Sequence, residues 1–143
     1  MMETFVQEVL SKEDFQVAWS VMQELRTHLS EEEYMTLLET MKGEGYRMFG
    51  LYNEEGEPLA LAGVAIVTNF YNGRHVFVYD LVTAERYRSQ GCGAKLLSYM
   101  EQWGKEHGCE NLALTSGFQR QDAHRFYERE GYEKRSFAFC KAL

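Results

Sequence analysis

Two glycines separated by one residue are the clearest candidate for chemistry in this chain. Gly91 and Gly93 belong to the segment Arg88–Lys95, which follows a β-branched and aromatic run at Val76–Val82. The next run, Ala94–Lys105, places its apolar residues on one helical face. Glycine lets the backbone turn tightly, and the first amides of the helix are left unpaired at the positive end of its dipole. Such a turn is suited to an anion, for example a phosphate or a pyrophosphate.

Three phosphate-binding patterns compete for this turn. A dinucleotide-binding fingerprint needs a third glycine where Leu96 stands, which disfavours a nucleotide-binding oxidoreductase. A P-loop needs Gly-Lys-Ser/Thr, which the segment Gly93–Leu96 does not supply. The remaining pattern, R-x-x-G-x-G after a strand, resembles the acyl-CoA pyrophosphate loop of the Gcn5-related N-acetyltransferases, the GNAT family. A glycine-rich turn that merely joins two elements is the structural alternative.

A second segment strengthens this resemblance. The run Asp122–Tyr132 is similar to the family's A-x-x-F-Y-x-x-x-G-F/Y signature, in which a short helix ends at a glycine, here Gly131. Both motifs occur in the family's order and spacing. The resemblance covers residues 80–143 well and the N-terminal half only in its pattern of elements. The tail from Arg120 to Leu143 looks especially like the aminoalkylphosphonate N-acetyltransferases.

The resemblance implies acetyl-CoA as the acyl donor. In such folds the sheet splays beside the strand before the loop, and its free main chain pairs with the pantetheine arm as another strand would. The glycine loop would cap the pyrophosphate, so a reactive Cys92 thiol at the helix start is disfavoured because the pyrophosphate would cover it. The residues expected at the cofactor are Leu81, Val82, Thr83, Arg88, Ser89, Gln90, Gly91, Cys92, Gly93, Ala94, Lys95, Asp122 and Phe126.

Acetyl transfer also needs a neutral amine and a proton for the departing CoA thiolate. Tyr127 occupies the family's general-acid position, and a phenol of pKa ~10 can protonate a thiolate whose conjugate acid has a pKa of ~8.5. Packing on the cofactor is the alternative role for Tyr127. Asp80 and Tyr79 are the candidate bases, although neighbours in a strand face opposite sides unless a β-bulge intervenes. Many relatives carry Glu at the position of Tyr79, so a direct base is in doubt, and a structural ion pair is the alternative for Asp80.

The acceptor is the least defined part of the predicted site. Arg120 and Arg125 lie beside the predicted acid in the sequence and are the candidate ligands of an anionic group. The resemblance implies that the two N-terminal helices help to choose the acceptor, and the acidic run Glu31–Glu33 at their link would suit a polyamine or another cation. The predicted acceptor is a primary amine of a small molecule. A protein lysine or N-terminus, and a non-catalytic acetyl-CoA sensor, are the alternatives.

Composition fits a single domain over residues 1–143, because a chain of 143 residues with 45% hydrophobic content can bury one core. A net charge of −7 argues against nucleic acid as a partner. The three cysteines and four histidines lack disulfide or metal-ligand spacing, so we expect no metal and a reducing, cytoplasmic compartment. No apolar run approaches the ~20 residues of a membrane helix, so no membrane partner is expected. A homodimer stays open.

The sequence predicts the order β-α-α-β-β-β-α-β-α-β for the strands and helices that carry the candidate site residues. This order matches the α+β acetyltransferase fold, a mostly antiparallel, splayed sheet flanked by about four helices. Ser11 and Ser30 predict two helix starts, the second as a capping box with Glu33, and Asn72-Gly73 predicts a hairpin. One helix is expected after each of these two serines, and two more at 94–105 and 121–130. The expected strands are Thr4–Leu10, Tyr46–Tyr52, Leu59–Thr68, Val76–Val82, Asn111–Thr115 and a final strand or hairpin at Tyr132–Lys141.

Overall fold

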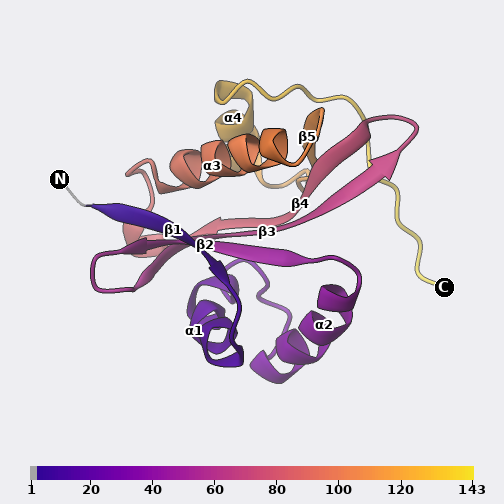
Figure 1. Ribbon diagram of the computed structural model, residues 1–143. Helices are drawn as coiled ribbons and strands as arrows, with labels where there is room; N and C mark the ends of the chain where they lie inside the picture. The colour runs from indigo at the N-terminus through magenta and orange to yellow at the C-terminus, as the bar shows by residue number, and fades with distance from the viewer. Residues whose placement is uncertain (1–2) are drawn as a thin grey trace. The chain divides into compact units, whose positions relative to one another are not determined.

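The computed structural model describes residues 3–143, which form two compact units (Figure 1). The first unit ends at Ala113, and the second runs from Leu114 to Leu143. Neighbouring strands of the sheet follow one another in chain order, and the pairs β1/β2, β2/β3 and β3/β4 are antiparallel. The strands are β1 (Thr4–Val9), β2 (Arg47–Asn53), β3 (Pro58–Asn69), β4 (Gly73–Thr83) and β5 (Asn111–Leu114).

Helices cover both faces of this sheet. Figure 1 shows α1 and α2 on one face and α3 on the opposite face. The first eight residues of β3, Pro58–Ala65, are all buried without alternation, as expected for a strand covered on both sides. The helices are α1 (Lys12–Met22), α2 (Glu31–Gly43), α3 (Cys92–Glu106) and, in the second unit, α4 (Gln121–Arg129), with a short 3-10 helix η1 (Glu85–Tyr87) before α3.

The predicted helix starts of α1 and α2 are confirmed. The Ser11 hydroxyl accepts a hydrogen bond from the Asp14 amide at 3.1 Å. Ser30 accepts one from the Glu33 amide at 3.1 Å, and the Glu33 carboxylate accepts one from the Ser30 amide at 2.9 Å. Both pairs satisfy amides that the first helical turn leaves without partners. One carboxylate of the acidic run Glu31–Glu33 is therefore engaged in the cap.

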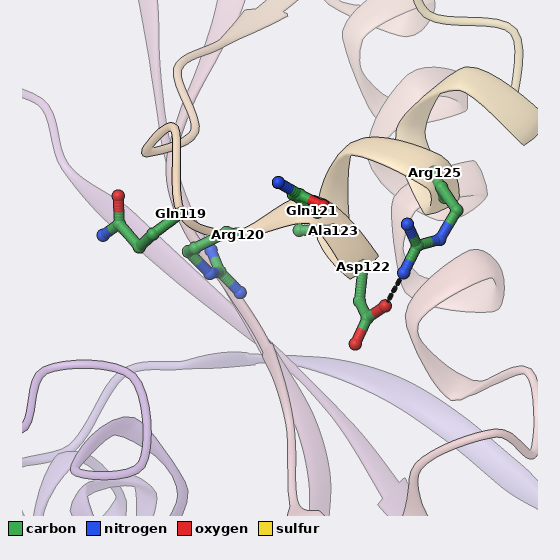
Figure 2. A pocket seen from close by; sticks show the side chains of 6 residues that line it. All are labelled: Gln119, Arg120, Gln121, Asp122, Ala123 and Arg125. Atoms are coloured by element: carbon green, nitrogen blue, oxygen red, sulfur yellow. Dashed lines mark hydrogen bonds and ion pairs between the residues drawn. The ribbon is translucent and has the colours of Figure 1, made fainter.

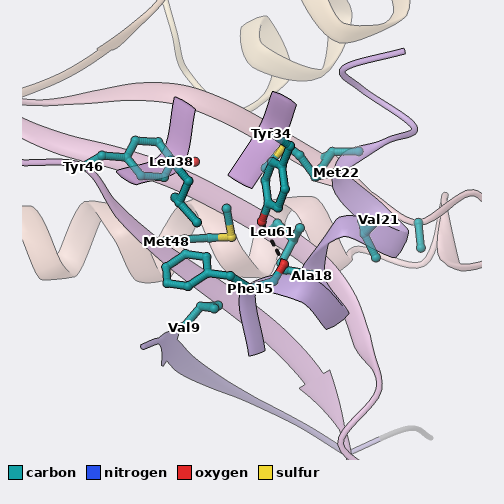
Figure 3. Packing of buried hydrophobic residues seen from close by; sticks show 12 residues of the cluster. Val9, Phe15, Ala18, Val21, Met22, Tyr34, Leu38, Tyr46, Met48 and Leu61 are labelled. Carbon is teal, nitrogen blue, oxygen red and sulfur yellow. Dashed lines mark hydrogen bonds between the residues drawn. The ribbon is translucent and has the colours of Figure 1, made fainter. Parts of the chain in front are cut away.

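The core between α1, α2 and the sheet is mainly apolar. Phe15, Leu38, Met48 and Leu61 are each at most 3% exposed and pack together (Figure 3). Tyr34 joins them and donates its hydroxyl proton to the Phe15 carbonyl at 3.0 Å, so its polar end is satisfied. On the other face, α3 buries its apolar stripe against the sheet. That stripe consists of Leu96, Leu97, Met100 and Trp103.

The hairpin predicted at Asn72-Gly73 joins β3 to β4. Gly73 has a φ of +64°, the left-handed conformation that such a turn requires. The Asn69 side chain accepts a hydrogen bond from the Asn72 amide at 2.6 Å, and Asn69 pairs with Gly73 in the sheet register. The hairpin therefore sets the register of β4, which leads to the glycine loop.

The final strand or hairpin predicted at Tyr132–Lys141 is wrong. In the described residues α4 ends at a left-handed Gly131 with φ +95°, as its position predicts, but no strand follows β5. The alternating side chains of Phe137 and Phe139 are 71% and 95% exposed. Alternation stabilises a strand only where one face has a surface to pack against, and these aromatic side chains have little such surface.

Candidate functional site

The candidate site residues fall into both compact units. In the first unit, the glycine loop adopts the backbone of an anion-binding turn. Ser89 and Gly91 have φ of +64° and +82°, and Gly91 is the N-cap of α3. The first helical hydrogen bond runs from the Lys95 amide to the Gly91 carbonyl at 3.0 Å, and Gly91 offers no side-chain cap. The amides of Cys92, Gly93 and Ala94 therefore have no acceptor within the helix and suit an oxyanion.

The side chains around the loop are already engaged. Arg88 donates from Nε to the Thr83 carbonyl at 3.2 Å, and its Nη2 lies 3.5 Å from Glu24 Oε1. Lys95 donates to the Thr4 hydroxyl at 3.0 Å. Burial raises the pKa of the Cys92 thiol although Lys95 opposes the rise, so the thiol is protonated and a poor nucleophile. The loop thus presents mainly backbone amides, as the sequence predicts for a pyrophosphate.

A β-bulge lies in β4 beside the candidate bases. Gly63 of β3 pairs with Asp80, whereas the next residue, Val64, pairs with Val78, so Tyr79 is the extra residue. Tyr46 contacts both neighbours: its ring centroid is 5.8 Å from that of Tyr79, and its hydroxyl donates to Asp80 Oδ2 at 2.8 Å. The bulge therefore turns both side chains toward Tyr46. Neighbouring residues of a strand can face the same side only where such a bulge intervenes.

Asp80 is 7% exposed, and both of its carboxylate oxygens have partners. Arg26 donates to Oδ1 at 2.9 Å, and Tyr46 donates to Oδ2. Burial, together with the charge of Asp80, holds the pKa of Tyr46 well above its ordinary value, so that phenol keeps its proton and donates it. This arrangement is the structural ion pair that the sequence kept as an alternative. The more exposed candidate beside it is Tyr79, at 42%.

The main chain expected to meet pantetheine lies at the far end of β4. Leu81, Val82 and Thr83 pair on one side with β3. On the other side, the Glu110 amide just before β5 donates to the Arg74 carbonyl at 2.8 Å. The four residues of β5 span about 13 Å at a strand's rise, whereas Leu81 lies about 23 Å along β4 from Arg74. This edge of β4 therefore extends beyond its partner strand in the sheet.

In the second unit, α4 carries Tyr127 in a half-buried position. Burial raises the pKa of this phenol above its ordinary value, and the positive charge of Arg120 opposes part of the rise. Its ring makes edge contacts with Phe126 and Tyr132 at centroid distances of 5.2 and 6.0 Å. A phenol that keeps its proton at neutral pH is a competent proton donor.

The first turn of α4 borders an open hollow of about 440 Å³ (Figure 2). Asp122 and Arg125 form an ion pair there, drawn as the dashed line in Figure 2, so the charge of Arg125 is compensated. Among the described residues, Arg120 has no carboxylate within ion-pair distance. The lining residues are Gln119, Arg120, Gln121, Asp122, Ala123 and Arg125.

Sequence reasoning missed Glu24, Arg26 and Tyr46. They lie between 34 and 64 positions from the residues they contact, and no local pattern marks such pairs. Across residues 3–143, His, Cys, Asp and Glu side chains nowhere gather in threes as metal ligands. In the same stretch, every helix is too short or too polar to cross a membrane.

The fold and the two motifs define an acyltransferase of the acetyl-CoA-dependent kind, and comparison with known proteins agrees. The model of the acetyltransferase (GNAT) family matches residues 12–132. The chain belongs to this family and is an acetyl-CoA-dependent N-acetyltransferase. It is 38% identical over 140 residues to the uncharacterized N-acetyltransferase YhdJ of Bacillus subtilis (strain 168), covering 96% of this chain and 98% of that protein.

Two further similarities are narrower. The aminoalkylphosphonate N-acetyltransferase of Salmonella typhimurium (strain LT2) is 41% identical over 66 residues, which are 46% of this chain and 43% of that protein. The aminoglycoside N-acetyltransferase AAC(6')-Iy, solved in complex with CoA, superimposes with a TM-score of 0.85 at 14% identity, over 100% of this chain and 96% of that one. This second likeness concerns the fold. Within residues 3–143 the fold is α+β, with a mostly antiparallel sheet and four α-helices, as predicted.

Proposed function

We propose that this chain, acting as one catalytic domain of residues 1–143, transfers an acetyl group from acetyl-CoA directly to a primary amine of a small molecule. The observation that carries the proposal is the turn at Gly91, whose backbone leaves the amides of Cys92, Gly93 and Ala94 without helical acceptors. The free edge of β4 supports it, because pantetheine binds as an added strand. The CoA complex of AAC(6')-Iy, which shares the fold, adds support by analogy.

In the proposed reaction, the neutral amine attacks the thioester carbonyl carbon and a tetrahedral intermediate forms. Its collapse breaks the C–S bond, and Tyr127 gives its phenolic proton to the departing thiolate. The amine's proton leaves to water, because the carboxylate oxygens of Asp80 are occupied by Arg26 and Tyr46. Tyr79, exposed on the same bulge, lies against Tyr46 and is proposed to line the path of the amine.

The acceptor we favour carries an anionic group. The partial similarity to an aminoalkylphosphonate N-acetyltransferase supports this, and so does the uncompensated charge of Arg120 beside Tyr127. Arg125 is the weaker of the two candidate ligands because it is paired with Asp122. A cationic acceptor at Glu31–Glu33 is less favoured, since Glu33 serves the capping box.

The proposal is tested by calorimetric titration with acetyl-CoA, followed by a panel of amines assayed for release of free CoA thiol. Binding together with thiol release that depends on an amine supports the transferase. Binding without release under any amine supports the alternative, an acetyl-CoA sensor. The absence of binding would contradict both.

The acceptor class is tested with an aminoalkylphosphonate and the matching alkylamine. A charge-assisted contact of about 1.5 to 3 kcal/mol predicts that the phosphonate is preferred by about 10- to 150-fold in kcat/KM. Arg120→Ala should remove the preference, and Arg129→Ala, at the opposite end of α4 from Arg120, should keep it. Preference for the alkylamine or for a polyamine would contradict the anionic acceptor but leave acetyl transfer standing.

A further inference from the structure

The turn that follows α1 carries two charged residues that reach the sheet at different places. Its backbone is fixed, because the Met22 carbonyl accepts hydrogen bonds from the amides of Leu25 at 3.0 Å and Arg26 at 2.9 Å. Leu25 packs against the buried core of the first unit. Glu24 and Arg26 flank Leu25, so a residue held in the core sets the position of both.

Glu24 holds the segment that leads into the glycine loop. Its Oε1 accepts a hydrogen bond from the Glu85 amide at 2.9 Å, at the first residue of η1. That amide has no acceptor within its own helix turn, and Ala84 before it makes no side-chain cap. The same oxygen lies 3.5 Å from Nη2 of Arg88, the last residue before the turn of Ser89 to Gly91.

Arg26 holds the bulge. Its Nε donates to Asp80 Oδ1 at 2.9 Å, and its Nη2 donates to the carbonyl of Tyr79 at 2.8 Å. Tyr79 has no partner residue in the register with β3, and this second bond holds its carbonyl. Lysine offers the same charge but not the planar fork that reaches both acceptors.

These two sets of contacts enclose one stretch of main chain. Arg26 fixes Tyr79 and Asp80 at its start, and Glu24 fixes the Glu85 amide at its end. Between them lie residues 81–84, of which 81–83 are the main chain assigned to the pantetheine arm under the proposed function. We infer that Glu24 and Arg26 are positioning residues: Glu24 sets the loop for acetyl-CoA, and Arg26 sets the bulge for the acceptor's turnover. The inference rests on the proposed function for these consequences, but not for the contacts themselves.

The test uses three variants of the full chain. Glu24→Ala removes the acceptor of the Glu85 amide, and Arg26→Lys keeps the charge but removes the fork. Glu44→Gln, at an exposed glutamate after α2, is the matched control. For each variant, calorimetry measures the Kd for acetyl-CoA, steady-state kinetics measure kcat and both KM values, and hydrogen exchange follows the amides of residues 77–91.

We expect Glu24→Ala to raise the Kd and KM for acetyl-CoA by about tenfold, while kcat at saturation stays within about threefold. Arg26→Lys should leave the Kd for acetyl-CoA within about threefold and lower kcat/KM for the amine by about 10- to 100-fold. Faster exchange should be confined to residues 84–91 in the first variant and 77–83 in the second.

The two variants must therefore separate. Equal losses in every parameter, or losses that follow the melting temperature alone, would overturn the inference and leave the proposed function intact. The inference would also be overturned if Glu24→Ala and Arg26→Lys showed the same exchange rates as Glu44→Gln, whatever their turnover. If wild-type protein fails to bind acetyl-CoA, the proposed function falls, and the assignment of Glu24 and Arg26 to catalysis falls with it.

Discussion

A tyrosine acts as a general acid only if its phenol is still protonated when the thiolate leaves. Burial raises the pKa of Tyr127, so at neutral pH its proton is available. Tyr127→Phe should keep acetyl-CoA affinity and lower kcat by about 10²-fold. In the wild type, the alkaline fall of kcat should come at a higher pH than for an ordinary phenol, because burial raises the pKa of Tyr127. Calorimetry and a pH–rate profile measure both.

The control for this prediction is the melting temperature of the variant. Similar stability and similar affinity, combined with unchanged turnover, would return Tyr127 to packing against its aromatic neighbours Phe126 and Tyr132. Equal losses in affinity and rate would indicate a damaged fold rather than a lost acid.

Two substitutions at Gly91 distinguish the cost of its backbone conformation from the loss of ligand binding. A Cβ at this position would meet no atom within 4 Å, but the φ of +82° is unfavourable for other residues. Gly91→Ala should therefore cost about 1 kcal/mol of unfolding free energy and keep much of the acetyl-CoA affinity. Gly91→Asp places a carboxylate against the pyrophosphate and should weaken binding by more than about 100-fold, because like charges repel in a partly desolvated site.

Urea unfolding and calorimetry on both variants measure these effects. Equal acetyl-CoA affinity of Gly91→Asp and Gly91→Ala would contradict a pyrophosphate at this turn. As a control for folding, Gly91→Asp should unfold in urea with a cooperativity like that of the wild type.

Single residues with local partners could be read from the sequence, and residues with distant partners could not. Ser30 and Glu33 are three positions apart, so their capping box is visible in the sequence. Arg26 and Asp80 are 54 positions apart, and only the fold joins them. The sequence could name Asp80 as a candidate base but not show that its oxygens are already occupied.

At the scale of elements, the strands and helices of the first unit follow their expected ranges because pattern and burial agree. The bulge at Tyr79 cannot be predicted from a local pattern, because it depends on how β3 aligns with β4. The segment from Tyr132 to Lys141 fails for the opposite reason. Its pattern is that of a strand, but its side chains are exposed and no strand follows β5 in the described residues.

Gly63 pairs with Asp80 at the bulge, so a substitution there tests how Tyr46 and Asp80 pack against β3. A Cβ there would overlap the Tyr46 hydroxyl and lie 2.6 Å from Asp80 Oδ2. Gly63→Ala should lower the unfolding free energy by about 1 to 3 kcal/mol, because the hydroxyl and the carboxylate must both move. Adding Tyr46→Phe removes the closest atom, so the double variant should lose less than the sum of the two single losses.

Urea unfolding of the four proteins of this cycle gives the interaction energy between the two positions. Additive losses would mean that Tyr46 does not lie over Gly63. Gly43, whose Cβ position is open, serves as the control substitution to alanine and should show no comparable loss.

Two buried phenols, Tyr34 and Tyr46, make the stability of the folded protein depend on pH in the alkaline range. Burial is the main cause that raises the pKa of Tyr34 and Tyr46 far above the ordinary value, and the charge of Asp80 adds to both shifts. The folded state therefore holds these protons more tightly than the unfolded chain, whose phenols titrate near pH ~10. Their contribution to stability is complete below about pH 10 and is lost as the pH rises further, by about 1.4 kcal/mol per pH unit for each phenol that stays protonated.

Urea unfolding between pH 8 and pH 11 measures this slope. Tyr34→Phe should cost about 1 kcal/mol at pH 8, since its hydrogen bond to the Phe15 carbonyl is lost, and it should make the alkaline slope shallower. Tyr71→Phe, at a residue that is 69% exposed, should leave the slope unchanged. A wild-type stability that stays flat to pH 11, or an equal slope in Tyr34→Phe, would mean that these phenols ionise without unfolding the core. The prediction concerns the core that α1 and α2 build on the sheet, so it stands whether or not the chain binds acetyl-CoA.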